Sequence, residues 1–233
     1  MSTFYIVATP IGNLEDLSFR AFRILQEVDL ILSEDTRITK KLLDHYKIKT
    51  PTSSYHQHTK LQKIEYIVNL LKKGKNLALV SDAGVPGISD PGNLLINEII
   101  KKLKTEVKIT PIPGPSALTA AASISGFPMD KFLFLGFPPS KRKRKKFFKE
   151  VLNSKYSIIF YESPYRILKT LQELKLETEN YHLEPEIVVC RELTKKFEIT
   201  YRGKIKEILN QLEKNKIKGE FIIIIPKIMI GYG

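Results

Sequence analysis

Twelve residues, SDAGVPGISDPG (81–92), combine residue types that are typical of ligand-binding loops. The stretch holds three glycines, two prolines, two aspartates and two serines, and it has no Lys or Arg. Glycines allow a backbone to approach a ligand closely, and prolines restrict the shape of a loop. Without basic residues the loop suits a triphosphate poorly, whereas its carboxylates suit hydroxyl, amine or sulfonium groups.

Three further loops of similar character follow short apolar runs in the first half of the chain. They read TPIGN (9–13), EDTR (34–37) and PGPSA (113–117). Ligands of parallel sheets bind beyond the carboxyl ends of the strands, so four such loops at one edge predict a pocket. The sequence has neither a G-x-x-x-x-G-K-[ST] nor a G-x-G-x-x-G motif, which excludes a P-loop and a standard dinucleotide fingerprint. A backbone-rich, neutral-to-acidic pocket suits S-adenosylmethionine, and it would also suit a nucleoside.

The elements that must position these loops alternate between strands and helices. In the first half, strands are expected at 4–8, 29–33, 76–81 and 107–112, with amphipathic helices between them. Asp90 and Pro91 predict the N-cap and first turn of the helix that follows the 81–92 loop. This alternation is typical of an α/β fold with a mostly parallel sheet that is covered on both faces.

The second half repeats the alternation without repeating the sequence. Strands are expected at 132–136, 156–162, 186–193, 197–203 and 219–226, and helices near 116–125, 140–153, 164–174 and 204–214. The close spacing of two strands around 194–196 predicts a hairpin, so the second sheet should be mixed. We expect two α/β domains, 1–114 and 115–233, because Pro and Gly cluster where they meet.

The composition favours a globular protein of the cytoplasm. Hydrophobic residues make up 42% of the chain, but no apolar run reaches the roughly 18 residues needed to cross a membrane. The N-terminus lacks the basic region of a signal peptide. Cys190, the only cysteine, lies in an apolar run, which favours a buried structural thiol. His56 and His58 have no carboxylate or cysteine close by in the sequence, so no metal site is expected.

The charge is strongly positive, with a formal net value of +13. The segment SKRKRKKFFK (140–149) contains six consecutive basic residues, Lys141, Arg142, Lys143, Arg144, Lys145 and Lys146. Such an excess fits a polyanionic partner. The alternative is a solvated surface segment, which is what most charge runs are.

Seven motifs stand in the same order as in the ribosomal RNA small subunit methyltransferase I family, a branch of the tetrapyrrole methylase superfamily. They are TPIGNLEDL, SEDTR, VSDAGVPGISDPG, PIPGPSAL, IFYESPYRI, CRELTKKFE and KGEF. The chain therefore resembles this family from about residue 4 to residue 222. The resemblance implies two α/β domains with S-adenosylmethionine in the cleft between them, usually in a homodimer. It also implies 2′-O-methylation of a cytidine ribose in the decoding region of 16S ribosomal RNA.

The resemblance also implies a set of cofactor contacts, made chiefly by backbone groups. They are Pro10, Asp82, Ala83, Gly84, Pro86, Gly87, Ser116, Ala117, Tyr161 and Leu193. A tight structural turn is the alternative for Gly84 and its neighbours, and core packing is the alternative for Tyr161 and Leu193. With an RNA substrate implied, we expect the basic residues 141–146 to contact RNA phosphates.

Methyl transfer to a ribose hydroxyl requires alignment of the reacting atoms and is helped by a nearby proton acceptor. Asp35 is a candidate acceptor, and Arg37 is a candidate ligand for a phosphate. Glu192 is an alternative acceptor. The EDTR segment has a structural interpretation as well, as the N-cap and first-turn charges of a helix over 36–46.

Two other functions remain open from the sequence. The first is a small-molecule methyltransferase of the same fold, and the second is an RNA-binding ribosome assembly protein without catalysis. The first loop, ATPIGN, has a single glycine where the small-molecule tetrapyrrole methylases have more, which argues against a corrin or porphyrin substrate. The four polar loops that follow the expected strands argue against a protein without a ligand.

Overall fold

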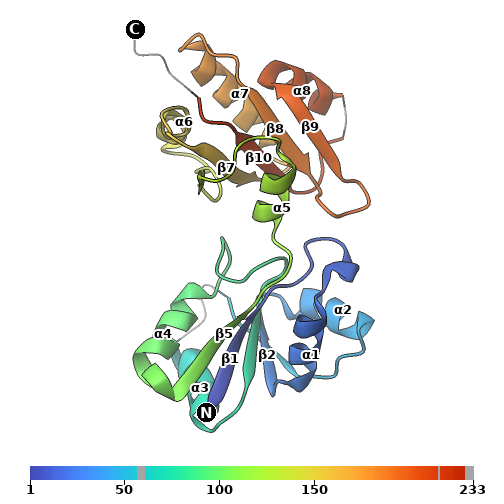
Figure 1. The fold of residues 1–233 in the computed structure, drawn as a ribbon, viewed down its shortest axis with the longest axis vertical. Coiled ribbons are helices and arrows are strands. Elements are labelled where there is room, and N and C mark those ends of the chain that lie inside the picture. The colour runs from blue at the N-terminus through green and yellow to red at the C-terminus, as the bar shows by residue number, and fades with distance from the viewer. Residues whose placement is uncertain (57–60, 215, 229–233) are drawn as a thin grey trace. The chain divides into compact units, whose positions relative to one another are not determined.

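The computed structural model describes residues 1–56, 61–214 and 216–228 (Figure 1). Internal contacts divide the chain into two compact units, Met1–Ser116 and Ala117–Gly233. Each unit contains one five-stranded sheet with helices packed against it. The fold is therefore α/β in both halves, as the alternation of strands and helices predicts.

The sheet of the first unit is entirely parallel and has the strand order β3-β2-β4-β1-β5. Its strands are β1 (Ser2–Val7), β2 (Leu30–Ser33), β3 (Thr52–Ser54), β4 (Leu77–Val80) and β5 (Val107–Ile112). The central β4 reads LALV and is buried along its whole length, as expected for a strand covered on both faces. The short β3 is not expected from the sequence, because TSS lacks an apolar run.

Helices cover both faces of this sheet (Figure 1). Helices α1 (Phe19–Glu27) and α2 (Thr36–His45) share one core cluster, and α3 (Leu61–Lys72) and α4 (Asn93–Leu103) share the other. Short 3₁₀ turns at Leu14–Asp16 and Lys104–Glu106 complete the connections. Because every strand runs the same way, all the loops that follow strands emerge at one edge of the sheet.

The expected start of α4 is wrong by two residues. The N-cap is Gly92, not Asp90, and it makes no side-chain capping bond. Gly92 has a φ of 153°, which is not helical, so the turn extends through Pro91. The Asn93 side chain then donates a hydrogen bond to the Gly87 carbonyl oxygen at 3.0 Å. The 81–92 loop is thus closed on itself before the helix begins.

The second unit has a mixed sheet with the strand order β6-β7-β10-β8-β9. Its strands are β6 (Phe132–Phe134), β7 (Ser157–Glu162), β8 (Glu186–Arg191), β9 (Ile199–Lys204) and β10 (Phe221–Ile225). Only the β6–β7 pair is parallel, and β8 and β9 form the antiparallel hairpin that their spacing predicts.

The helices of the second unit build one large core on this sheet. Helices α6 (Arg144–Leu152), α7 (Ile167–Glu179) and α8 (Ile205–Glu213) contribute to a cluster with the strands, and α5 (Ala117–Ile124) packs against β10. Helix α6 begins at Arg144, four residues later than expected, so the first half of the basic run precedes the helix. Among the described residues, no helix has both the length and the apolar character needed to span a membrane.

Candidate active site

The loops after β1 and β4 are joined by backbone hydrogen bonds. The Thr9 N–H donates to the Gly84 carbonyl oxygen at 2.9 Å, and the Gly84 N–H donates to the Thr9 carbonyl oxygen at 3.0 Å. The Thr9 hydroxyl adds a bond to the Ser81 carbonyl oxygen at 3.2 Å. The structure therefore brings the TPIGN loop and the 81–92 loop together.

The loops after β2 and β5 meet the same cluster. The Asp35 N–H donates to Asp82 Oδ1 at 3.0 Å, which links the β2 exit to the β4 exit. On the other side, the Ala8 N–H donates to the Ile112 carbonyl oxygen at 3.1 Å, and a Cβ on Gly114 would lie 3.0 Å from the Ala8 Cβ. All four loops singled out in the sequence thus lie in contact at one edge of the first sheet.

Two glycines of the 81–92 loop have backbone conformations that other residues adopt with strain. Gly84 has a φ of 82° and Gly87 has a φ of 86°. Gly84 is buried, and a Cβ there would reach ordinary contact distance from Ile11 Cγ2, 3.4 Å away. A Cβ on Gly87 would come within 2.8 Å of Asn93 Oδ1. These glycines shape the turn, so the structural interpretation of the loop holds whether or not it also contacts a ligand.

The chemistry of this cluster fits S-adenosylmethionine. Residues 81–92 place a partly buried carboxylate, Asp82, among main-chain groups, with no basic side chain of their own. Burial raises the pKa of Asp82, and the Asp35 N–H lowers it in part. A carboxylate in such surroundings favours a cationic or hydrogen-bond-donating ligand, such as a sulfonium, amine or hydroxyl group. Of the other cofactor candidates in this unit, Pro10 and Pro86 are buried, Ala83 is exposed and Ser116 is half-buried.

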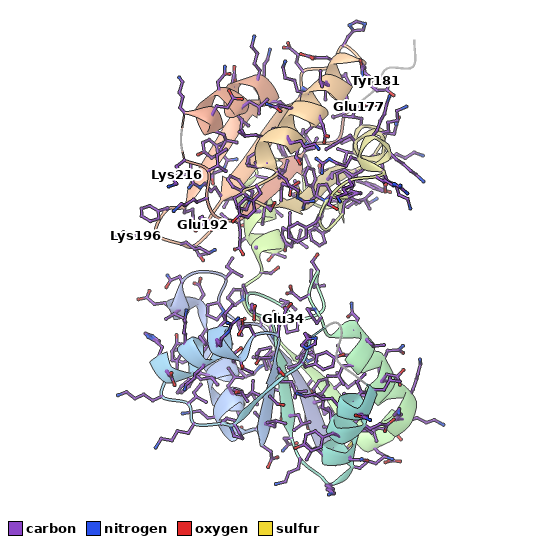
Figure 2. The ribbon with its side chains drawn as sticks, turned by 180° about the vertical axis from the view of Figure 1, so that it is seen from behind. Glu34, Glu177, Tyr181, Glu192, Lys196 and Lys216 are labelled. Atoms are coloured by element: carbon purple, nitrogen blue, oxygen red, sulfur yellow. The ribbon has the colours of Figure 1, made fainter. Side chains whose placement is uncertain are left out.

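A pocket of about 540 Å³ lies at the same edge of the sheet. It is lined by Glu34, Tyr55, Ser89, Asp90, Pro91, Gly92, Asn93 and Leu94. Figure 2 shows Glu34 at the end of the first sheet from which the loops emerge. Sequence reasoning missed Tyr55 because it follows the short, polar β3, whereas the place of Glu34 directly after an apolar strand was a signal available from the sequence.

Asp35 and Arg37 form a local structural pair. Asp35 is the N-cap of α2, where its Oδ1 accepts from the Arg37 N–H at 2.8 Å, and its Oδ2 lies 2.6 Å from Arg37 Nη2. These bonds to Arg37 lower the pKa of Asp35 to about 2. A carboxylate that acidic is a weak proton acceptor, so the geometry favours the helix-capping interpretation that the sequence left open.

Glu192 also has a structural place, in the second unit. Its carboxylate accepts from the Glu220 N–H and from Lys195 Nζ, both at 2.9 Å, and a Cβ on Gly219 would overlap its side chain. Burial acts to raise the pKa of Glu192, but Lys195 and the Glu220 N–H outweigh it and the pKa is lowered. Glu192 therefore fastens the β8–β9 hairpin to the start of β10, which explains the glycine in the KGEF motif.

Three further cofactor candidates lie in the second unit. Ala117 is the first residue of α5, and Leu193 is 9% exposed at the start of the β8–β9 loop. The Tyr161 ring contacts two phenylalanine rings, with centroid distances of 4.8 Å to Phe134 and 5.5 Å to Phe137.

Arg144 is not available as an RNA contact, and that expectation needs correction. Its side chain is 6% exposed, its Nη1 donates to the Pro139 carbonyl oxygen at 2.8 Å and its Nη2 donates to the Thr170 hydroxyl at 2.8 Å. Its guanidinium also forms an ion pair with Glu173 at 2.6 Å. The chain buries this cation because it has a fixed partner for each donor group, whereas its neighbours in the run remain exposed. We use the name basic segment for the exposed set, Lys141, Arg142, Lys143, Lys145 and Lys146.

Cys190 is buried in β8, as expected of a structural thiol, and burial raises its pKa. His56 is exposed, and His58 lies outside the described residues. The part of the chain that the structure describes has no group of three or more His, Cys, Asp or Glu side chains that could hold a metal ion.

Comparisons with known proteins agree with this architecture. The profile of the family described as Tetrapyrrole (Corrin/Porphyrin) Methylases matches residues 3–209. The protein named ribosomal RNA small subunit methyltransferase I from Thermotoga maritima is 44% identical, over 97% of this chain and 98% of its own length. The protein of the same name from Halalkalibacterium halodurans is 45% identical, over 96% of this chain and 75% of its own length.

Among solved structures, a diphthine synthase matches with a TM-score of 0.72 at 11% identity, covering 100% of this chain and 92% of that one. At that identity the match shows the fold alone. The family profile covers most of the chain, and the relatives align over nearly all of it at more than 40% identity. The chain therefore belongs to the tetrapyrrole methylase family, in the group of the ribosomal RNA small subunit methyltransferase I proteins.

Proposed function

We propose that this protein methylates the ribose 2′-hydroxyl of a cytidine in the decoding region of 16S ribosomal RNA. As a member of its family the chain is a methyltransferase, and its cofactor is S-adenosylmethionine. The single observation that carries the RNA substrate is the near-full-length similarity to proteins named ribosomal RNA small subunit methyltransferase I. The cytidine, the ribose oxygen and the decoding region come from the resemblance of the seven motifs.

The strand-exit cluster of the first unit would hold the cofactor. Backbone groups of Gly84, Pro86 and Gly87 and the carboxylate of Asp82 are its nearest candidates, together with Pro10 and Ser116. When bound, S-adenosylmethionine supplies an activated methyl group on a positively charged sulfur. The protein then has to align the ribose oxygen with that methyl group, exclude water and provide an acceptor for the hydroxyl proton.

The basic segment would hold the RNA. Its five exposed cations lie on either side of the buried Arg144 in sequence and do not share the partners that bury it. Phosphates neutralise such cations and release counterions, which supports binding without reading the base sequence. A corrin or porphyrin substrate is not favoured by any observation on this chain.

Analysis of the methylated nucleoside tests the proposed reaction. Purified protein is incubated with S-adenosylmethionine and with small ribosomal subunits, or naked 16S ribosomal RNA, from a strain that lacks this gene. We expect a cytidine that carries the new methyl group on its ribose, identified by mass spectrometry after digestion. A methyl group on the base would refute the ribose assignment, and RNA binding without any methylation would favour the assembly-protein alternative.

A homodimer and a cytoplasmic location are part of the same proposal, the first from the resemblance and the second from the composition of the chain. Light scattering coupled to size-exclusion chromatography tests the first, and we expect twice the mass of the 233-residue chain. A monomer at micromolar concentration would remove the dimer from the proposal. Fractionation of the producing cell tests the second.

A further inference from the structure

We infer that the pocket beside β2 receives the target nucleoside, and that Glu34 is the residue that accepts the proton of its hydroxyl group. The inference rests on the proposed function and assigns a further catalytic residue to it. Glu34 directly follows Ser33, the last residue of β2, and it lines the pocket.

The pocket has the size of a small-molecule site. Its volume of about 540 Å³ falls within the range of roughly 300–1,000 Å³ that is typical of ligand pockets. Tyr55, which is 2% exposed and packs in the core of the first unit, closes one side, and the residues from Ser89 to Leu94 complete the lining. The polar lining residues, among them Glu34, Ser89 and Asp90, suit the hydroxyl groups of a nucleoside. The 81–92 loop takes part in both the pocket and the cluster of strand exits, so a nucleoside here would lie beside the cofactor candidates.

Two neighbouring carboxylates at the β2 exit have different surroundings. Both oxygens of Asp35 are bound by Arg37. Among the described residues, Glu34 makes no ion pair, and it lines the pocket. Glu34 is therefore the one of the two that a substrate hydroxyl can reach without displacing a structural partner.

The charges around Glu34 make it a better base than Asp35. Burial, and after it the Asp82 carboxylate, raise the pKa of Glu34, and Asp35 adds to the effect. His56 acts in the opposite direction. Asp90 is a second carboxylate in the lining of the pocket. A carboxylate whose pKa is raised accepts a proton more readily near neutral pH.

The reaction that this arrangement supports is balanced in atoms and charge. The ribose oxygen forms a bond to the methyl carbon while the carbon–sulfur bond breaks and its electron pair returns to sulfur. The hydroxyl proton passes to the Glu34 carboxylate and then to solvent. The charge of the sulfonium is thereby lost, and one proton is released for each methyl group transferred.

Thiol protection tests the pocket without relying on activity. Leu94 lines the pocket and Ile100 lies on the same helix outside it, and both side chains are 51% exposed. The only native cysteine, Cys190, is buried. We expect small ribosomal subunits that lack the methyl group to slow iodoacetamide labelling of Leu94→Cys at least fivefold, and to leave labelling of Ile100→Cys within twofold. Equal protection of the two variants, or protection of neither, overturns the pocket assignment.

Glu34→Gln tests the proton acceptor, with Glu106→Gln as its matched control. Glu106 is an exposed residue before β5, at the opposite edge of the same sheet. In single turnover, Glu34→Gln should react roughly 10²- to 10⁴-fold more slowly than wild type, the range for a lost general base. The loss of rate at acidic pH should also disappear in this variant. Affinities for S-adenosylmethionine and for RNA should stay within twofold, and Glu106→Gln should match wild type throughout.

The results separate this inference from the proposed function. The role of Glu34 is overturned, even if the ribose is methylated, by either of two results. The first is a Glu34→Gln rate within twofold of the Glu106→Gln rate, and the second is a Glu34→Gln rate that still falls at acidic pH as in wild type. If Glu34→Gln is slow, binds RNA or cofactor more weakly and still loses rate at acidic pH, then Glu34 has a structural role and is not the proton acceptor. If wild type methylates a base instead, the proposed function fails, and the thiol experiment still decides whether the pocket holds the nucleoside.

Discussion

Replacement of Arg144 by Met should destabilise the second unit far more than the same change at its exposed neighbour Lys145. The Arg144 guanidinium is bound by Glu173, by the Thr170 hydroxyl and by the Pro139 carbonyl oxygen. The guanidinium carbon also lies 5.5 Å from the centroid of the Phe148 ring. Methionine keeps much of the apolar stem of arginine, but it has neither the charge nor the donors. The variant therefore removes the polar contacts while it fills most of the space.

The expected loss can be worked out from these contacts. Removal of one partner of a buried ion pair costs roughly 3–5 kcal/mol, because the remaining charge is left without compensation. Glu173 is 30% exposed and Lys169 lies 4.0 Å from it, so water and a second cation offset part of the loss. The lower end, about 3 kcal/mol, is the appropriate figure. For a chain of this size, that corresponds to a melting temperature lowered by about 6–12 °C.

Thermal unfolding followed by circular dichroism measures this difference, and Lys145→Met is the control. Lys145 is exposed on the same helix, and surface substitutions of this kind stay within about 0.5 kcal/mol of wild type. A melting temperature of Arg144→Met within about 2 °C of Lys145→Met would refute the reasoning, since the structural network would then contribute little. In that case Arg144 would return to the candidate RNA contacts.

The site leads to three further predictions. Gly84→Ala should weaken the binding of S-adenosylmethionine, measured by calorimetry. The control is Gly74→Ala, because Gly74 has a similar φ of 81° but open space around it. This variant should lose a similar amount of stability and keep its affinity for S-adenosylmethionine. Because the pKa of Asp35 is lowered in the folded state, its charge stabilises the fold above pH 3.8 and that contribution is lost as the pH falls toward about 2. The stability difference between wild type and Asp35→Asn, measured in urea, should accordingly vanish over that interval, and a constant difference would contradict the pairing with Arg37. Glutamine at all five positions of the basic segment should flatten the slope of log affinity for RNA against log salt concentration. The slope should change by roughly 0.7–0.9 for each phosphate that the variant no longer neutralises. An unchanged slope would mean that the segment is only a solvated surface.

The pH dependence of folding stability tests whether the surroundings of Glu34 disfavour its charged form. Its pKa is raised in the folded protein, so its contribution to stability is present at low pH and is lost as the pH rises through the folded-state pKa. Glu34→Gln should therefore be at least as stable as wild type at neutral pH, although it is the slower enzyme. Such an exchange of stability for activity is common where a site holds an unfavourable charge.

The sequence by itself determined the fold class and the position of the loops. Apolar runs such as NLALV recur between amphipathic segments, and this alternation is local information that predicts strands and helices. Parallel strands also present their carboxyl ends at one edge, so the four polar loops had to emerge there. The strand order, with β2, β4, β1 and β5 side by side, then made them neighbours. The order of the motifs along the chain indicated the family without any knowledge of the structure.

Only the tertiary structure decided what individual side chains do within these segments. Arg144 has the same kind of neighbours in sequence as Lys143 and Lys145, but it alone is buried, because Glu173 and Thr170 come from a helix that is distant in sequence. Glu34 and Asp35 are adjacent acids, and only the capping of α2 and the lining of the pocket separate their roles. Burial and pairing depend on residues far apart along the chain, so local sequence predicts which groups are charged, and the packed structure decides which of those charges remain free to act.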